Sequence, residues 1–363
     1  MNAMKRPPSP SSLFRTFSGK YIPRIDASMR GFFKEKILDA KLPVIREMYA
    51  LLSEYCTRKG KRVRPLVMLL ACFGYGEEKN ADDIIPIAAV LEMMHSFLLI
   101  QDDIIDRSDL RRGGQSLHLL CGRRFAGGSH NRNIGSDLAL ILADVLFAGA
   151  LKIICESNVP HRAKDRFMKI FSDTYEITAW GQVLDILNSR SKKIVSPGET
   201  ALQIATMKTA YYTVYYPMLM GYALAGKNSG RERNLIGEFS LPLGLAFQIR
   251  DDILGVFGKE KATGKPSDSD ILEGKITLLV NGVLERLDRR ERSLFISLFT
   301  GSKKEKKDIE KIRSIIEESG SLDAAKQQHC DLIDVSRRRL SRLSIADPFR
   351  TALGGLVDLI AKI

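Results

Sequence analysis

Two pairs of adjacent aspartates constrain this chain more than any other feature of its sequence. Asp102-Asp103 and Asp251-Asp252 each end a long apolar stretch that has helical periodicity. A carboxylate on a largely buried helix is costly unless a cation or hydrogen bonds compensate its charge. Two such clusters therefore predict helices that face each other across divalent metal ions, with an anionic group bridging them.

Helical periodicity dominates from about Met29 to the last residue, and the short alternating stretches lack hairpin turn signals. No linker or shift in composition marks a second domain. We therefore expect an all-α fold in which residues 29–363 form a single domain, an orthogonal and antiparallel helical bundle. The expected helices cover residues 29–58, 62–75, 81–107, 137–156, 162–187, 198–225, 230–257, 270–287, 289–299, 305–318, 320–343 and 347–362.

Residues 1–25 contain basic side chains but no acid, together with several prolines and serines. This composition predicts that residues 1–28 are a flexible or processed segment, and it leaves import into an organelle open. The five cysteines are scattered, which favours a reducing compartment over a disulfide framework. The best candidate for a membrane span, residues 84–100, contains Glu92 and His95. We expect a cytoplasmic protein without a transmembrane segment.

The formal net charge of +13 favours a polyanionic partner. The densest basic runs, residues 303–307 and 337–339, have acids nearby and no interleaved aromatics, so they predict solvated surfaces rather than a nucleic-acid patch. Other basic side chains adjoin the aspartate pairs or reach them across a bundle: Lys61, Arg62, Arg64, Arg111, Arg112, Lys208 and Lys265. Because arginine forks grip phosphate oxygens and lysine adds a point charge, this pattern predicts a diphosphate clamp shared with metal ions.

Asp102 and Asp106 are four residues apart, so they share one face of a helix, and Asp103 flanks them. Mg²⁺ suits such a strip because it binds one or two carboxylates, keeps waters and shares phosphate oxygens. No histidine or cysteine stands beside these carboxylates, so a transition-metal site is not indicated. His95 lies one to two turns before Asp102 at nearly the same azimuth. It is either a buried core residue or a phosphate ligand.

Taken in order, these segments resemble the trans-isoprenyl diphosphate synthases, also called the polyprenyl synthetase family, and most of all its short-chain geranylgeranyl and farnesyl members. The matching stretches are residues 60–65, 92–113, the Lys208-Thr209 pair and residues 247–277. The resemblance implies an isoprenoid synthase fold, a helical bundle with a deep central cavity that is usually a homodimer. It also implies head-to-tail condensation of isopentenyl diphosphate with an allylic diphosphate, with pyrophosphate as the leaving group.

The resemblance also implies a role for each residue that matches a family motif. Two or three Mg²⁺ ions would be bound by Asp102, Asp106 and Asp251, and the implied catalytic set adds Asp103, Asp252 and Lys208. Isopentenyl diphosphate would be bound by Lys61, Arg64, His95 and Arg112. The allylic diphosphate would be bound by Arg111, Lys208, Thr209, Gln248 and Lys265. Gly255 departs from the pattern, because many relatives have the last aspartate of the second motif at this position.

Two residues beneath the first aspartate strip bear on product length. Leu98 is four residues before Asp102 and therefore lies on the same helix face, and Phe97 is its neighbour. In the family that the chain resembles, large side chains at these positions form the bottom of the pocket and limit the length of the product. A single aromatic at the fifth position before the motif resembles synthases of geranylgeranyl diphosphate (C20), with farnesyl diphosphate (C15) as the alternative. The segment of residues 121–133 is longer and more polar than the resemblance leads us to expect. It is either a surface loop or a mobile flap over the cavity.

Three other functions compete with this interpretation. A class I terpene cyclase shares an Asp-Asp-x-x-Asp strip, but it does not need the basic groups of residues 60–65 and 111–112 for a second diphosphate. A non-catalytic partner subunit would have lost parts of the aspartate or arginine set, whereas only Gly255 departs here. A helical nucleic-acid-binding protein would carry its basic residues on one outer face and bind with strong salt dependence. We expect no nucleic-acid partner.

Overall fold

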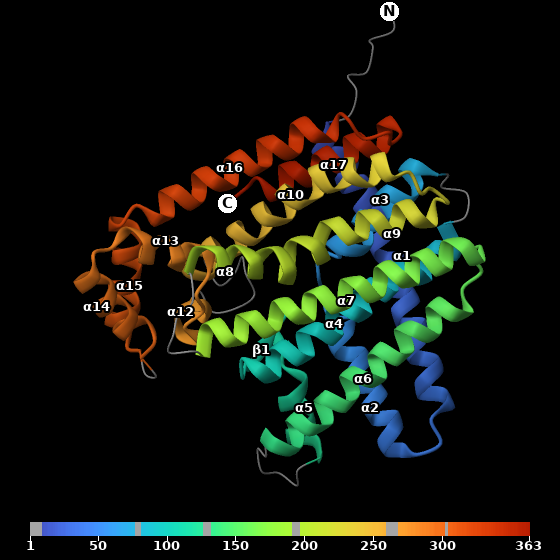
Figure 1. Ribbon diagram of the computed structural model, residues 1–363. Helices are drawn as coiled ribbons and strands as arrows, with labels where there is room; N and C mark the ends of the chain where they lie inside the picture. Colours follow the sequence, from blue (N-terminus) through green and yellow to red (C-terminus); the bar gives the residue numbers. More distant parts are fainter. Residues whose placement is uncertain (1–8, 77–80, 126–131, 191–196, 259–267, 302–303) are drawn as a thin grey trace, which may run out of the picture.

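A computed structural model describes residues 9–76, 81–125, 132–190, 197–258, 268–301 and 304–363. Long helices dominate them (Figure 1), so the predicted all-α fold is confirmed. The helices are α1 (Pro10–Asp39), α2 (Pro43–Cys56), α3 (Val63–Tyr75), α4 (Ala81–Ile105), α5 (Leu117–Phe125), α6 (Arg132–Glu156), α7 (His161–Arg190), α8 (Pro197–Ile204), η2 (Ala205–Tyr215), α9 (Tyr216–Leu224), α10 (Gly230–Phe257), α12 (Ser269–Glu273), α13 (Leu278–Arg286), α14 (Arg289–Phe299), α15 (Lys306–Glu318), α16 (Ser321–Leu340) and α17 (Asp347–Ile360).

The N-terminal helix corrects one expectation. Helix α1 begins at Pro10, and it packs against α17 with Phe14, Tyr21 and Ile25 buried. The predicted flexible segment over residues 1–28 is therefore wrong from residue 10 onward. Apolar side chains at helical spacing determine the structure here, and they outweigh the acid-free composition on which the prediction rested.

The expected helix over residues 29–58 is also divided. Helix α1 ends at Asp39, and α2 begins at Pro43. Leu42 is extended, with ψ of 130°, because the proline ring disfavours helical backbone in the residue before it. The break lets α2 turn back along α1, against which it packs.

Two hydrophobic clusters form the core. The larger unites residues of α1 to α7, η2, α9 and α10 with α16 and α17, and the smaller unites the end of α10 with α12 to α16. The smaller cluster forms the end of the molecule that carries α14 and α15 (Figure 1). Helix α10 belongs to both, with Leu243 in the larger cluster and Ile253 in the smaller. The second aspartate pair therefore lies where the two clusters meet.

The expected helix over residues 198–225 contains a widened segment. Residues Ala205–Tyr215 form the π-helix η2, between α8 and α9. A Cβ atom at Gly181 of α7 would lie 2.6 Å from the backbone N of Lys208, and one at Gly244 of α10 would lie 2.6 Å from Cα of Ala210. Two glycines thus let α7 and α10 press against η2 from different helices. π-helical turns are rare and concentrate at functional sites, and this one carries Lys208.

Helices α4 and α6 are long and apolar enough to cross a membrane by length and composition. Their mean hydropathies are 1.7 and 2.3, and 72% and 33% of the respective apolar windows are buried inside the protein. Helices of globular cores and interfaces pass the same test, so neither helix is assigned to a membrane. The burial of α4 places it in the core, whereas α6 leaves an apolar face exposed.

Candidate active site

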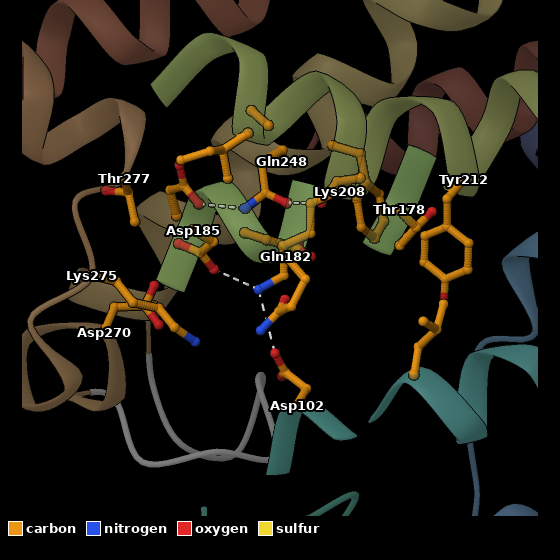
Figure 2. A pocket seen from close by; sticks show the side chains of 18 of the residues that line it. Asp102, Thr178, Gln182, Asp185, Lys208, Tyr212, Gln248, Asp270, Lys275 and Thr277 are labelled. Atoms are coloured by element: carbon orange, nitrogen blue, oxygen red, sulfur yellow. Dashed lines mark hydrogen bonds and ion pairs between the residues drawn. The ribbon is translucent and has the colours of Figure 1, made fainter. Parts of the chain in front are cut away.

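A cavity of about 540 Å³ lies between α4, α7, η2 and α10 (Figure 2). Charged residues from distant parts of the sequence line it together with apolar side chains. The structure brings Asp102, Asp251 and Asp252 to this one space, and Asp106 lines an adjoining cavity of about 460 Å³. Asp103 is fully buried beside the cavity.

The buried Asp103 holds an arginine in place. Its carboxylate accepts hydrogen bonds from the Tyr55 hydroxyl at 2.8 Å and from Nε of Arg111 at 2.7 Å. Arg111 also reaches Asp102, with Nη2 3.2 Å from its carboxylate. Burial raises the pKa of Asp103, and Arg111 opposes that rise. Asp103 thus anchors Arg111, whose guanidinium in turn compensates the first aspartate pair.

A two-residue hairpin orients this arginine and the next. Strand β1 (Leu110–Arg111) pairs antiparallel with β2 (Gly114–Gln115), an element that the sequence pattern did not predict. Arg112 and Gly113 form the turn with φ of 52° and 76°, as tight hairpins with the twist of natural strands require. Arg112 lines the cavity and lies 3.4 Å from Glu92.

Two lysines lie between carboxylates at the mouth. Nζ of Lys208 is 3.3 Å from Asp102 and 2.6 Å from Asp185, an arrangement visible in Figure 2. Nζ of Lys275 is 2.7 Å from Asp106 and 2.6 Å from Glu273. Burial alone would lower the pKa of both lysines, but the surrounding carboxylates raise it. Both ammonium groups therefore stay charged where negative charge converges.

Neutral groups hold Asp252 of the second aspartate pair. Nε2 of Gln248 donates to Asp252 at 2.5 Å, and the Thr209 hydroxyl donates to Oε1 of Gln248 at 2.5 Å. Burial, reinforced by the nearby Asp270 carboxylate, raises the pKa of Asp252 well above its ordinary value. Asp251 is 46% exposed and lies 3.2 Å from its neighbour Arg250. A cation at this wall would relieve the cost of the buried carboxylate.

The glycine that departs from the motif makes room for another carboxylate. A Cβ atom at Gly255 would lie 2.2 Å from Oδ2 of Asp270, so α12 presents its aspartate where the α10 side chain would begin. Asp270 lines the cavity and is visible near Lys275 in Figure 2. The second wall thus receives a carboxylate from another helix. The sequence pattern placed Asp270 at the start of an expected helix and gave it no role in the site.

Two of the residues proposed to bind isopentenyl diphosphate contact a tyrosine. Arg64 stacks 3.8 Å over the ring of Tyr212 and donates to the Thr213 hydroxyl at 3.0 Å. Nδ1 of His95 hydrogen-bonds the Tyr212 hydroxyl. Burial, followed by the charges of Arg64 and Arg112, lowers the pKa of His95 well below its usual range, so the imidazole is neutral.

The basic side chains of residues 60–65 point in different directions. Lys61 and Arg64 line the cavity. Arg62 points into the protein, where it is 2.8 Å from both Asp26 and Glu92. Its backbone has φ of 49°, a conformation that disfavours non-glycine residues, and these buried ion pairs hold it there. Arg62 therefore fixes the turn from which its two neighbours reach the cavity.

Other predicted positions are only partly placed. Thr209 and Leu98 line the cavity, whereas Phe97 is buried behind that lining. Lys265 lies outside the described residues, as does the middle of the segment 121–133. Sequence reasoning missed several residues that line the cavity from helices without a local marker, or that it quoted without a role: Thr178, Gln182, Asp185, Tyr212, Asp270 and Lys275.

The carboxylates suit a hard divalent cation. In the part of the chain that the structure describes, no group of three potential ligands converges on one point. Lysine ammonium groups lie between the carboxylates instead. The available donors are aspartate oxygens, which Mg²⁺ prefers, and the side-chain hydrogen bond to the buried Asp252 comes from the amide of Gln248 rather than from a lysine or arginine. The donor set therefore fits magnesium.

Comparisons with known proteins agree on one family. The model of the polyprenyl synthetase family matches residues 45–318. A geranylfarnesyl diphosphate synthase of Aeropyrum pernix is 34% identical over 307 residues, covering 84% of this chain and 90% of that protein. A geranylgeranyl diphosphate synthase of Methanosarcina mazei is 30% identical over 324 residues, covering 88% and 92%. The crystal structure of a geranylgeranyl pyrophosphate synthase from Corynebacterium glutamicum, complexed with isoprenyl diphosphate and magnesium, has a TM-score of 0.88 at 26% identity, covering 94% of this chain and 98% of that one.

Proposed function

This chain belongs to the polyprenyl synthetase family and is a short-chain prenyltransferase, and we propose that it makes geranylgeranyl diphosphate (C20) with Mg²⁺. The substrates are isopentenyl diphosphate and an allylic diphosphate, joined head to tail. The observation that carries the proposal is the single cavity in which two separate sets of basic residues adjoin the facing aspartates.

The two sets suit two diphosphates. Lys61, Arg64, His95 and Arg112 bind isopentenyl diphosphate. Arg111, Lys208, Thr209 and Gln248 bind the allylic diphosphate, and Lys265 keeps this role as a sequence-based proposal. Because the structure already fixes Arg111 through Asp103 and Lys208 between two carboxylates, these cations need little rearrangement to receive the negative charge that develops on the leaving group.

Asp102, Asp106 and Asp251 would hold two or three Mg²⁺ ions, with Asp252 and Asp270 supporting them. When bound, the metal neutralises diphosphate oxygens and stabilises the departing pyrophosphate. Support from Asp270 follows from its position against Gly255. The binding of cations also compensates Asp252, whose buried carboxylate is otherwise costly.

The protein residues then control the carbon chemistry. The allylic carbon–oxygen bond breaks, and its electron pair leaves with the pyrophosphate. The double bond of isopentenyl diphosphate attacks the allylic cation, and a proton passes from the adduct to the pyrophosphate. Leu98, Leu99 and Phe247 line the cavity and exclude water, which would otherwise convert the cation to an alcohol.

An exposed apolar face supports a homodimer. Helices α6 and α7 expose large hydrophobic side chains: Ile134, Leu140, Ile141, Trp180, Val183 and Leu187. Ile141 is 60% exposed and Leu187 is 59% exposed. Contiguous exposed apolar surface is typical of interaction sites, and a second copy of this chain is the occupant that the family implies. The unpaired cysteines support a reducing, cytoplasmic location.

The function is tested by incubating the protein with Mg²⁺, isopentenyl diphosphate and, in turn, the C5, C10 and C15 allylic diphosphates. We expect pyrophosphate release and, after dephosphorylation, geranylgeraniol as the main prenol by chromatography. A C15 or C25 main product would overturn the C20 assignment but keep the reaction class. Absence of pyrophosphate release with every primer would overturn the proposed reaction.

A further inference from the structure

The end of α2 packs against the hairpin that carries Arg111 and Arg112. Arg58 lies two residues after the last residue of α2, and its side chain is only 8% exposed. Nη1 of Arg58 donates to the backbone carbonyl of Arg111 at 2.9 Å. The guanidinium also lies against Gly114, where an added Cβ atom would come within 2.7 Å of Cζ of Arg58. One side chain thus contacts both strands of the hairpin, β1 at Arg111 and β2 at Gly114.

The last turn of α2 fixes the Arg58 side chain itself. Nε and Nη2 of Arg58 donate to the two carboxylate oxygens of Glu54, at 3.0 and 2.8 Å. Cζ of Arg58 lies 5.0 Å from the centre of the Tyr55 ring. A guanidinium presents its donors in one rigid plane, so the paired bonds to Glu54 point Nη1 at the carbonyl of Arg111. A lysine carries its donors on a single atom and does not fix such a plane.

The same turn of α2 also supports the Arg111 side chain. The Tyr55 hydroxyl donates to Asp103 at 2.8 Å, and Asp103 accepts from Nε of Arg111 at 2.7 Å. Arg111 is therefore held at two points. Its backbone is held by Arg58, and its guanidinium is held separately by the buried Asp103.

Arg112 depends more strongly on the backbone of the hairpin. It lies in the turn with φ of 52°, a conformation that is costly for a residue with a Cβ atom. Its guanidinium makes a long contact of 3.4 Å with Glu92, through the oxygen that lies 2.8 Å from Arg62. This side-chain contact is weaker than the one that anchors Arg111. The position of Arg112 is therefore set mainly by the backbone that Arg58 holds.

We propose that Arg58 is a positioning residue for isopentenyl diphosphate, because it holds the hairpin so that Arg112 points into the cavity. The inference rests on the proposed function, in which Arg112 binds isopentenyl diphosphate and Arg111 binds the allylic diphosphate. Arg58 lies outside the cavity lining, so it acts through the hairpin and does not touch the substrate. Since Asp103 anchors the Arg111 side chain separately, loss of Arg58 should disturb Arg112 more than Arg111.

The test measures kcat and the KM of each substrate in Arg58→Ala, with Mg²⁺ and with an allylic diphosphate that the unmodified protein extends. We expect KM for isopentenyl diphosphate to rise about tenfold, because a displaced binding group weakens ground-state and transition-state binding alike. The allylic KM and kcat should change much less. Calorimetric titration with isopentenyl diphosphate should show the same loss of affinity. An equal rise of both KM values would overturn the inference, since it would indicate a general change of the site.

Two further variants separate positioning from charge. Arg58→Lys keeps the charge without the planar donors, so we expect it to keep most of the increase in KM. Arg46→Ala removes the same charge from the opposite end of α2, where Arg46 donates to the backbone carbonyl of Ala40 at 3.1 Å. This control should leave both KM values unchanged. Full recovery of affinity in Arg58→Lys would overturn the inference, because charge alone would then explain the effect.

The glycine on β2 provides an independent test. In Gly114→Ala, the three nearest neighbours of the new Cβ atom would all be atoms of the Arg58 side chain. The methyl group should displace the guanidinium and raise KM for isopentenyl diphosphate, as Arg58→Ala does. In the Arg58→Ala background this methyl group has room, so the double variant should match Arg58→Ala alone. Additive losses would show that the hairpin does not depend on Arg58, and they would overturn the inference.

The outcomes also distinguish this inference from the proposed function. If the unmodified protein releases no pyrophosphate with any primer, the proposed function fails. If it is active and folded Arg58→Ala keeps its KM for isopentenyl diphosphate, the positioning role fails while the function stands. Should Arg58→Ala not fold, Arg58→Met replaces it, because methionine keeps an unbranched side chain over the Tyr55 ring and removes the donors. An unchanged KM in folded Arg58→Met would equally refute the role.

Discussion

The two sides of the cavity share a sequence motif but differ in how they hold charge. On the α4 wall, Asp102 and Asp103 are paired with Arg111 and Lys208. On the α10 wall, Asp252 is held by the amide of Gln248, and Asp251 is nearly half exposed with Arg250 3.2 Å away. The same Asp-Asp dipeptide therefore experiences opposite environments, because burial and neighbouring charges determine the cost of a carboxylate.

This difference teaches that cations of the protein compensate both aspartates of the α4 wall, whereas the buried Asp252 of the α10 wall is bonded by an amide and leaves more charge for a bound cation to compensate. Cations from η2 and the β-hairpin already balance the first pair. The second pair instead adds a further carboxylate, Asp270, to an already acidic place. We infer that metal binding stabilises the α10 wall more than the α4 wall.

The largest expected effect comes from removing one charge on each wall. Asp102→Asn should lower kcat/KM about a thousandfold and Asp251→Asn about a hundredfold, the range found when one preorganised electrostatic group is lost. The loss is greater at Asp102 because its carboxylate also positions Lys208 and Arg111. Pyrophosphate release at saturating Mg²⁺ measures both variants.

An exposed aspartate on α7, Asp165, provides the control, and Asp165→Asn should keep full activity. A greater loss at Asp251 than at Asp102 would contradict the comparison. It would show that the α4 wall, which protein cations compensate, contributes less to catalysis than the α10 wall.

A smaller effect is expected from one methyl group on the α10 wall. Gly255→Ala would push the Asp270 carboxylate away, because the new Cβ would lie 2.2 Å from its Oδ2. Displaced supporting groups typically weaken metal binding about ten- to a hundredfold. The Mg²⁺ concentration for half-maximal activity should rise accordingly. Gly237→Ala on the same helix is the matched control, since its Cβ would meet only Tyr215, at 3.4 Å.

Coupling between the two positions sharpens this test. If Gly255→Ala acts through Asp270, adding it to Asp270→Asn should cost little more than Asp270→Asn alone. Independent, additive losses would show that the α10 wall does not recruit its third carboxylate from α12.

The sequence predicted the features that are determined by residues close together in the chain. The aspartate pairs and the all-α fold follow from periodicity and from the cost of buried charge, whereas the shared site of Arg111 and Lys208 was implied by the family resemblance. Helix α10 was predicted over residues 230–257, where the structure has it. Such features depend on neighbours within a few turns of helix.

The rest depends on contacts between distant segments. Asp185 and Tyr212 lie on helices with ordinary polar patterns, and only packing between helices gives them partners, Lys208 of η2 for Asp185 and His95 of α4 for Tyr212. Arg62 could not be separated from Lys61 and Arg64, because the left-handed backbone that turns it inward is stabilised by Asp26 of α1. The part of that helix before residue 29 was itself missed, since its buried face was judged by composition.

The smallest expected effect is a pH dependence on the α4 wall. Burial and the arginines lower the pKa of His95 well below its ordinary value of 6.5, so the folded protein keeps the imidazole neutral after the unfolded chain has bound a proton. Stability is therefore full above about pH 6.5 and falls as the pH decreases through the window below it, by about 1.4 kcal/mol per pH unit. Thermal unfolding of His95→Gln should show a shallower loss than the unmodified protein over this window. The control is His161→Gln, at an exposed histidine, which should leave the slope of stability against pH unchanged. An equally steep loss of stability in His95→Gln would mean that the arginines around the α4 wall do not disfavour protonation of His95.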